Sequence, residues 1–183
     1  MLMNSLVELD RAHLVHPVAS YRGHEKAGVR VLQSGKGARV RDAGGHELVD
    51  SFAGLWCVNA GYGQEAIIEA ATRQLRELPY ATGYFGLGSE PAIRLASELA
   101  DRAPGDLNHV YFTLGGSDAV DSTVRFIRYY YHSLGKPEKD QFISVTNGYH
   151  GSSTVGAGLT ALPAFHAGFG LPFDWQHKIP SHY

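Results

Sequence analysis

The fold is decided by residues 110–125, which read VYFTLGGSDAVDSTVR. The β-forming residues at the start of this stretch predict a short buried strand, and the paired glycines predict a tight turn. Val120, Val124, Ile127 and Tyr131 then follow at the spacing of the apolar face of a helix. A helix that begins directly after a turn presents unpaired N–H groups and the positive end of its dipole. The stretch therefore predicts an anion site at the start of this helix.

The composition is that of a globular protein without a strong charge bias. At 183 residues the chain could hold one ordinary domain, or a small domain and part of a larger one. Its 44% hydrophobic and 19% charged residues are typical of globular rather than disordered chains. The formal net charge is −2, and the Lys and Arg residues form no run that would follow a phosphate backbone. We therefore expect no nucleic-acid partner.

The sequence also argues against a membrane segment and a secreted protein. No stretch approaches the roughly 20 apolar residues that span a bilayer, and residues 1–11 do not resemble a secretory signal. The single cysteine, Cys57, cannot form an internal disulfide, so nothing indicates an oxidising compartment. We expect no membrane partner and a cytoplasmic location.

The ten histidines do not predict a metal centre. His13 with His16, and His150 with His166, lack the spacing of zinc proteases or zinc fingers. Histidines on the surface or in ordinary hydrogen bonds are the expected alternative. The sequence therefore predicts no metal site.

The N-terminal part of the chain predicts a small subdomain, residues 1–55. Residues 6–14 can form a short amphipathic helix that ends before Pro17, and a loop is expected through residues 21–24. Short alternating segments between glycine turns over residues 29–50 predict an antiparallel meander. Residues 56–183 then form the second predicted domain. It opens with two helices, one ended by Pro79 and one that follows Ser89.

A second strand is predicted at residues 141–145, after the helix that follows the opening stretch. Strand, helix and strand would form a right-handed crossover with parallel strands. The turn at 115–117 and the loop at 148–151 would then lie at one edge of the sheet, where open α/β sheets bind ligands. A phosphate site beside the ring of Tyr149 suits a flat, phosphorylated ligand. A small-residue helix and loops follow without a closing strand, so the sheet is expected to be incomplete.

Each of these residues also has a purely structural interpretation. Ser117 could be the N-cap of an ordinary strand-to-helix turn. Asp118 and Asp121 favour the helix dipole, but they would repel a phosphate unless their carboxylates point away. Tyr149 could stack on a ligand or pack against the sheet, and His150 could bond to a ligand or to a loop carbonyl. Aromatic residues in the glycine-rich loops around residues 56 and 84–85 could line a pocket or form small satellite cores.

Taken together, three motifs resemble a known family. GLWCVNAGYG at 54–63, GSDAVD at 116–121 and GYHG at 148–151 resemble successive motifs of class III (ω-amino acid or amine:pyruvate) aminotransferases. The resemblance runs from about Leu14 to the end of the chain. It implies the α/β fold of fold-type I transferases dependent on pyridoxal 5′-phosphate (PLP). That fold combines a small N-terminal α/β meander subdomain with the start of a mostly parallel three-layer large domain.

The resemblance also implies roles for particular residues. Gly116 and Ser117 would hold the PLP phosphate, and Tyr149 would stack on the pyridine ring with His150 beside it. Asp118 stands where the family often has Glu, which leaves the phosphate assignment intact.

The substrate side of the site is implied by the aromatic residues of the earlier motifs. Trp56 would line the substrate pocket. Tyr84 and Phe85 resemble the segment that reaches into the neighbouring subunit's site, which implies a homodimer or homotetramer.

No catalytic residue can be assigned from the sequence. In the family, the aspartate that pairs with the pyridine nitrogen and the Schiff-base lysine lie beyond the matched region. The lysines of this chain stand in other contexts: Lys26, Lys36, Lys136, Lys139 and Lys178. We expect a part of an enzyme that transfers an amino group from an amine or ω-amino acid to a keto acid such as pyruvate, inactive alone. The alternatives are a non-catalytic domain that binds a phosphorylated ligand or docks on a full-length subunit, and a PLP aminomutase or decarboxylase of the same fold.

Overall fold

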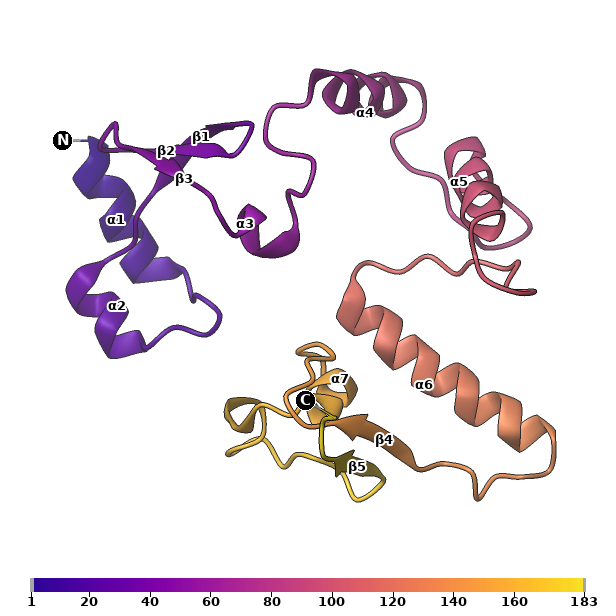
Figure 1. Ribbon diagram of the computed structural model, residues 1–183. Coiled ribbons are helices and arrows are strands. Elements are labelled where there is room, and N and C mark those ends of the chain that lie inside the picture. Colours follow the sequence, from indigo (N-terminus) through magenta and orange to yellow (C-terminus); the bar gives the residue numbers. More distant parts are fainter. Residues whose placement is uncertain (1, 183) are drawn as a thin grey trace. The chain divides into compact units, whose positions relative to one another are not determined.

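The computed structural model describes residues 2–182 (Figure 1). The chain divides between Ser89 and Glu90 into two units, each with its own internal contacts. The predicted division into domains at residue 55 stays a prediction. No helix among residues 2–182 is long and apolar enough to cross a membrane.

The first unit contains the antiparallel meander that the glycine turns predict. Strand β2 pairs with β1 on one side and with β3 on the other, with Val40 opposite Gly35 and Leu48. Val40 is buried, and the ring of Tyr62 packs so closely on Gly35 that a Cβ there would lie 2.7 Å from it. The elements are α1 (Leu2–His13), α2 (Tyr21–Ala27), β1 (Leu32–Lys36), β2 (Arg39–Asp42), β3 (Glu47–Val49), α3 (Ala53–Trp56) and α4 (Glu65–Glu77).

The loop predicted over residues 21–24 is wrong, because these residues begin α2. The sequence contains a recognisable capping residue at each end of this helix. Ser20 accepts a hydrogen bond from the N–H of Gly23 at 3.3 Å, and Gly28 ends the helix in a left-handed conformation, φ 69°. The predicted helix over residues 6–14 is confirmed as α1, which begins earlier.

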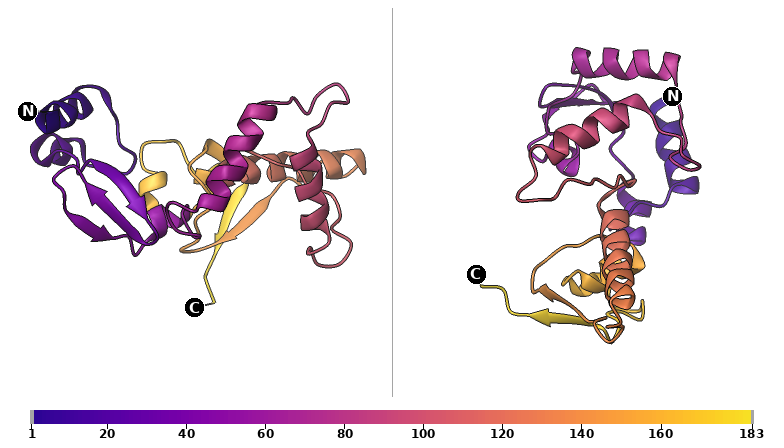
Figure 2. Two further views of the ribbon diagram at one scale, coloured as in Figure 1. Left: turned by 90° about the horizontal axis from the view of Figure 1, so that it is seen from above. Right: turned by 90° about the vertical axis from the view of Figure 1, so that its right-hand side faces the viewer.

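The second unit places one helix against a two-stranded parallel sheet. β4 and β5 lie side by side, with Phe142 opposite Gln176 and Val145 opposite Ile179 (Figure 2). Helix α7 packs on both strands, and its residues Ala157 and Leu159 are buried. The elements are α5 (Glu90–Ala100), α6 (Gly116–Ser133), β4 (Phe142–Val145), α7 (Thr154–Leu159), η1 (Pro163–Phe165) and β5 (Gln176–Ile179).

Two strand predictions in this unit are wrong. Residues 110–113 form no strand, because their backbone groups have no backbone hydrogen-bond partner among residues 2–182. Tyr111 is exposed and packs edge-on against Phe126, with ring centroids 5.1 Å apart. The parallel partner of β4 is instead β5, which lies in a region expected to be loop. The α/β class itself is confirmed.

Candidate functional site

The first part of the site is the N-terminus of α6. The helix begins at Gly116 after Gly115, which is extended and provides no side-chain cap. The first bond into the helix runs from the N–H of Ala119 to the carbonyl of Gly115, 2.9 Å. The N–H groups before it have no partner within the helix. Ser117 is in the first turn, so the interpretation of Ser117 as N-cap is wrong.

The space beside the two glycines at the helix start is open. A Cβ added at Gly115 or Gly116 would meet no atom within 4 Å. The two glycines thus leave room beside the positive end of the helix, which favours anions.

The second part is the loop that follows β4, and it lies directly against the first. The N–H of Ser152 donates to Ser117 Oγ at 3.0 Å. Gly151 has φ 116°, and a Cβ there would lie 2.5 Å from Ser117 Oγ. Only glycine allows this approach. The predicted juxtaposition of the turn at 115–117 and the loop at 148–151 is confirmed.

The two aspartates near the helix start are both bonded to protein donors. Asp118 Oδ2 accepts from the N–H of Leu114 at 3.2 Å. Asp121 Oδ1 accepts from Ser153 Oγ at 2.6 Å and from the N–H of Gly156 at 3.1 Å. These bonds give each carboxylate a partner within the fold. Asp121 in addition fixes the start of α7 to the first turns of α6.

The loop after β4 is held from below by a buried threonine. Thr160 is fully buried; its Oγ1 accepts from the N–H of His150 at 2.8 Å and donates to the carbonyl of Gly151 at 3.1 Å. The Nε2 atom of His150 is buried without a hydrogen-bond partner among residues 2–182. Tyr149 is 61% exposed and contacts Phe165 edge-on at 5.8 Å between ring centroids. Its ring is thus available to a ligand.

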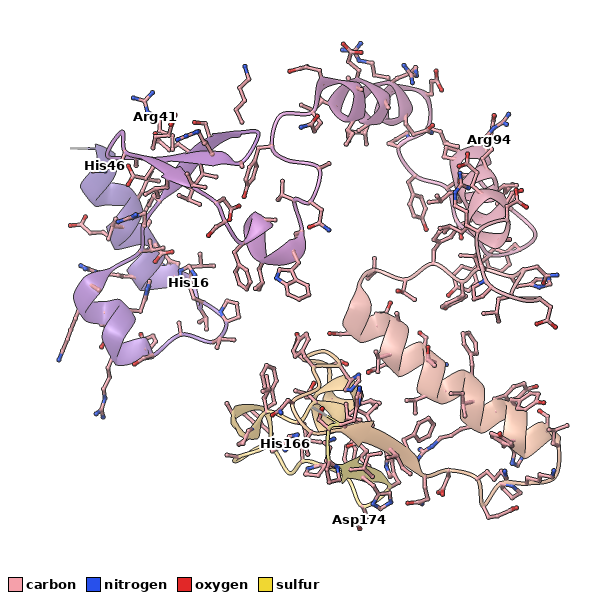
Figure 3. The ribbon with its side chains drawn as sticks, in the orientation of Figure 1. His16, Arg41, His46, Arg94, His166 and Asp174 are labelled. Carbon is pink, nitrogen blue, oxygen red and sulfur yellow. The ribbon has the colours of Figure 1, made fainter. Side chains whose placement is uncertain are left out.

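Helix α7 is fixed to its surroundings by polar side chains that sequence reasoning missed. Lys178 Nζ donates to Ser144 Oγ and to the carbonyls of Gly158 and Leu159, at 2.7–2.9 Å. Burial lowers the pKa of the Lys178 amine. His166 lies beside the helix and contacts the Ala157 carbonyl at 3.0 Å (Figure 3). Lys178 and His166 are distant in sequence from the residues they contact, so no local pattern predicts these contacts. Ser153 differs, because serine before a helix is a recognisable N-cap.

The predicted substrate residues belong to the first unit, and their rings are exposed. Trp56 is 73% exposed and contacts Phe52 edge-on, while Tyr84 and Phe85 contact each other at 6.0 Å between centroids. Tyr84 and Phe85 are 75% and 95% exposed. Their assignment to a substrate pocket stays a prediction.

Trp56 is presented by an unusual turn. Ala53, Gly54, Leu55 and Trp56 all have positive φ, between 49° and 70°. For the three residues other than glycine this conformation is unfavourable, and it persists only where the surroundings enforce it.

Asp50 provides that enforcement. Its carboxylate accepts from the N–H groups of Phe52 and Gly54, at 3.2 and 2.7 Å, and from the Tyr62 hydroxyl at 2.8 Å. The Tyr62 hydrogen bond, supported by the two N–H bonds and opposed by burial, holds the pKa of Asp50 below its ordinary value. The same hydrogen bond raises the pKa of Tyr62, and burial adds to this.

Comparisons with known proteins place the chain in a family. The profile of the aminotransferase class-III family matches residues 20–182. The putrescine–pyruvate aminotransferase of Pseudomonas aeruginosa is 41% identical over 158 residues, which are 86% of this chain and 35% of that protein. The diaminobutyrate–2-oxoglutarate transaminase of Halomonas elongata is 39% identical over 171 residues, 92% of this chain and 36% of that protein.

Solved structures agree with these relatives. The ω-transaminase of Pseudomonas jessenii in complex with PMP matches 96% of this chain and 39% of its own, with a TM-score of 0.94 and 35% identity. The (S)-enantioselective ω-transaminase of Thermomicrobium roseum matches 98% of this chain and 40% of its own, with a TM-score of 0.94 and 36% identity. The chain thus spans well under half the length of the proteins it resembles.

Fold and motifs together define a transferase of the PLP-dependent fold-type I class. Within that class, the chain belongs to the class III aminotransferase family, whose members depend on PLP.

Proposed function

We propose that this chain is the cofactor-binding N-terminal part of an enzyme that moves an amino group from an amine or ω-amino acid to a keto acid such as pyruvate. The observation that carries the proposal is the close approach of Gly151 to Ser117, which joins two loops into one anion site. We call this site the cradle: the N-terminus of α6 (Gly115–Ser117) and the loop Gly148–Gly151. The names of the relatives, among them a putrescine–pyruvate aminotransferase, support this reaction over an aminomutase or decarboxylase.

The cradle residues fit PLP by their chemistry. The N–H groups at Gly116 and Ser117 and the Ser117 hydroxyl would bind the phosphate, since helix N-termini favour anions. The exposed ring of Tyr149 would stack on the pyridine ring, and the unpartnered Nε2 of His150 would make a polar contact beside it. When bound, the cofactor supplies an electron sink, and the chain orients it.

The proposal also includes the substrate pocket and the oligomeric state of the enzyme. Trp56 would line the substrate pocket, and Tyr84 and Phe85 would reach a neighbouring subunit in a homodimer or homotetramer. Their large exposed rings support a role in contacts outside their own unit. A cytoplasmic location completes the proposal.

We further propose that the chain does not turn over alone. An aminotransferase needs a lysine that carries the cofactor and moves a proton at the substrate Cα. Lys178, the lysine of this unit that is partly buried, uses its amine on three oxygens of the fold. The second candidate function, a non-catalytic part that binds phosphorylated ligands, rests on this observation.

Borohydride reduction in the presence of PLP tests whether this chain itself supplies a lysine that carries the cofactor. The intact mass of the treated chain is measured. A chain without a lysine-specific adduct supports the inactive part, and an adduct on one particular lysine contradicts it.

Binding of PLP by the chain, measured against pyridoxal, tests the phosphate site. We expect PLP to bind at least about tenfold more tightly, because the helix N-terminus recognises the phosphate. Ser117→Glu should abolish this difference, since the carboxylate occupies the site and repels the anion. Thr123→Glu adds the same charge to an exposed position of the same helix and should preserve it. An unchanged PLP preference in Ser117→Glu contradicts the assignment.

A further inference from the structure

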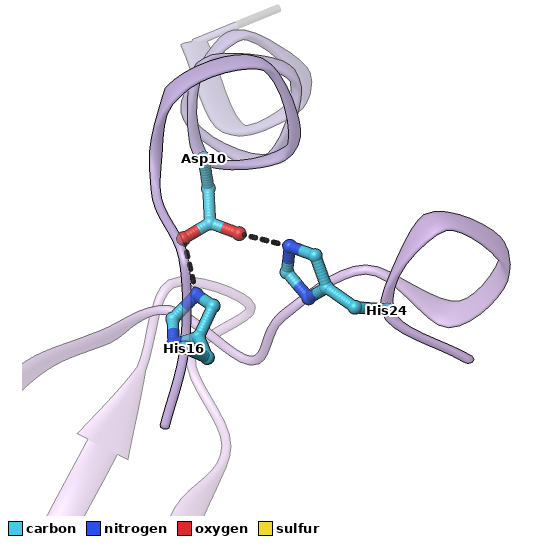
Figure 4. Close-up of side chains that lie close together, drawn as sticks. All are labelled: Asp10, His16 and His24. Carbon is cyan, nitrogen blue, oxygen red and sulfur yellow. Dashed lines mark hydrogen bonds and ion pairs between the residues drawn. The ribbon is translucent and has the colours of Figure 1, made fainter. Parts of the chain in front are cut away.

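Three side chains of the first unit converge near the N-terminus, and none of them is a residue of the cradle. Asp10 lies on α1, His16 lies in the connection after it, and His24 lies on α2 (Figure 4). One ligand atom from each of the three can be chosen so that all lie within 4.8 Å of one another. The sequence, with spacings D-x5-H and H-x7-H, gave no metal motif.

The two imidazoles present their Nε2 atoms to the two oxygens of one carboxylate. His16 Nε2 lies 2.8 Å from Asp10 Oδ1, and His24 Nε2 lies 2.9 Å from Asp10 Oδ2. The rings are 4.8 Å apart between centroids and tilted by 53°. Donor atoms around a zinc ion with bonds of about 2.0–2.1 Å are about 3.3 Å apart. Around a bound ion the contacts of 2.8 and 2.9 Å would therefore lengthen, and a donor pair as far apart as 4.8 Å would shorten.

The contact between His24 Nε2 and Asp10 Oδ2 does not meet the geometry of a hydrogen bond. Asp10 Oδ2 and His24 Nε2 are buried and, despite their short distance, neither has a hydrogen-bond partner among residues 2–182. A buried carboxylate oxygen and a buried ring nitrogen that face each other without a hydrogen bond are costly. A cation between them would satisfy both atoms.

The backbone holds the three donors in place. Asp10 and His24 are fixed by their helices, and His16 precedes Pro17, which restricts the conformation of its backbone. The side chains of Asp10 and His24 are only 11% and 10% exposed, while His16 is 29% exposed and leaves access from solvent. The nearby guanidinium of Arg11 contacts the carbonyl of Lys26 instead of the carboxylate.

We propose that Asp10, His16 and His24 bind a divalent transition metal of the zinc type, which fastens α1 to α2. Two imidazoles and one carboxylate suit zinc, cobalt or nickel, whereas magnesium and calcium prefer oxygen donors. The fourth position is open to water. This inference does not depend on the proposed function, because none of its residues belongs to the cradle.

The test is a calorimetric titration of the chelator-treated chain with Zn²⁺. Co²⁺ serves as a spectroscopic probe in a parallel titration. We expect one saturable site, a Co²⁺ spectrum with imidazole ligands, and no comparable binding of Mg²⁺. His46→Gln is the matched control: His46 also contacts an aspartate, Asp42, at 3.1 Å, but lacks a second histidine. The His46→Gln chain should bind Zn²⁺ with the affinity of the parent chain.

Paired substitutions separate metal binding from hydrogen bonding. His24→Gln keeps an N–H donor but is a poor ligand, so Zn²⁺ affinity should fall at least about tenfold. His24→Cys removes the ring but keeps a ligand atom, so it should retain binding. Far-UV circular dichroism confirms that α1 and α2 are retained in each variant, and the same pair of substitutions at His16 provides a second series. Absence of saturable Zn²⁺ binding by the parent chain, or equal affinity in the Gln and parent chains, overturns the proposal.

Discussion

The cradle and the exposed aromatic residues of the first unit are built in opposite ways. The cradle combines small residues and backbone N–H groups with Tyr149 and His150, and Thr160 fixes its second loop with hydrogen bonds inside the same unit. Asp121 ties the helix that follows this loop to α6. The aromatic wall, by which we mean Trp56, Tyr84 and Phe85, consists of large rings that are at least 73% exposed. The same chain thus contains one site element fixed by buried hydrogen bonds and another whose rings are mostly exposed in their own unit.

This difference follows from what each element has to bind. A phosphate is recognised by fixed N–H groups, and those must be positioned before the ligand arrives. An apolar ring contributes only when another surface covers it, so its own unit need only present it. We therefore expect substitutions in the cradle to reduce stability, and substitutions in the aromatic wall to leave it nearly unchanged.

The two tryptophans allow each unit to be followed separately. Trp175 belongs to the second unit and Trp56 to the first, and the chain has no others. A Trp56→Phe chain reports the unfolding of the second unit, and a Trp175→Phe chain reports that of the first. The predictions below use these two backgrounds.

The largest effect is expected from Gly151→Ala in the Trp56→Phe chain. The added Cβ would meet Ser117 Oγ at 2.5 Å and Ser117 Cα at 2.9 Å, at φ 116°. Backbone strain and overpacking together should lower the free energy of unfolding by about 3 kcal/mol or more. Urea unfolding followed by Trp175 fluorescence measures the change.

Gly135→Ala is the control for this prediction. Gly135 also has a positive φ, 69°, but no atom lies within 4 Å of an added Cβ. It should lose only about 1 kcal/mol, the cost of the left-handed conformation. Equal losses in the two variants would show that the close approach of Gly151 to Ser117 contributes nothing.

The next effect is expected from Asp121→Ala in the same background. This substitution removes the acceptor for Ser153 Oγ and for the N–H of Gly156, and so releases the start of α7 from α6. Loss of hydrogen bonds to a charged group should lower the free energy of unfolding by about 2 kcal/mol. Asp118→Ala removes the same charge from an exposed residue with one bond and should change it by less than about 0.5 kcal/mol. If Asp118→Ala is the more damaging variant, Asp121 does not hold α7.

The sequence predicts those parts of the fold that depend on local signals. The meander follows from its glycine turns, and α6 follows from the Gly115-Gly116 turn and the break at Pro137. β5 was missed because its residues, QHKI, show no apolar run, although Gln176 is buried. The strand predicted at 110–113 has the right residues, but a strand also needs a neighbour.

The site shows the same limit. The approach of residues 115–117 to 148–151 is confirmed, although the prediction relied on a strand at 110–113 that does not form. The bonds of Thr160 join residues that periodicity does not connect. The contact of His16 and His24 with Asp10 depends on how α1, α2 and the segment between them pack on one another. Spacing alone carries no such information.

A smaller, pH-dependent effect is expected in the turn that presents Trp56. Because the Tyr62 bond lowers the folded pKa of Asp50 below the unfolded value of about 3.9, its stabilising bonds are complete above that pH. They are lost as the pH falls through the folded pKa. The fluorescence of Trp56 in the Trp175→Phe chain should therefore change in this acidic range.

Asp50→Asn separates this effect from general acid unfolding. In that variant the change of Trp56 fluorescence should already be present at neutral pH, and the acidic step should disappear. Glu47→Gln removes a carboxylate of the same unit that is bound to the exposed Arg39, and it should leave the acidic step in place. Persistence of the full acidic step in Asp50→Asn contradicts the role of Asp50.

The smallest effect is expected from Phe85→Ala, which removes the most exposed ring of the aromatic wall. Phe85 is 95% exposed and contacts Tyr84 with its ring, so little apolar area returns to water when the ring is removed. The free energy of unfolding of the first unit, followed by Trp56 in the Trp175→Phe chain, should change by less than about 0.5 kcal/mol. Leu48→Ala, in the partly buried middle of β3, should lower it by more in the same background. A loss above about 1 kcal/mol in Phe85→Ala would mean that the ring is packed within its own unit, and the contrast with the cradle would then fail.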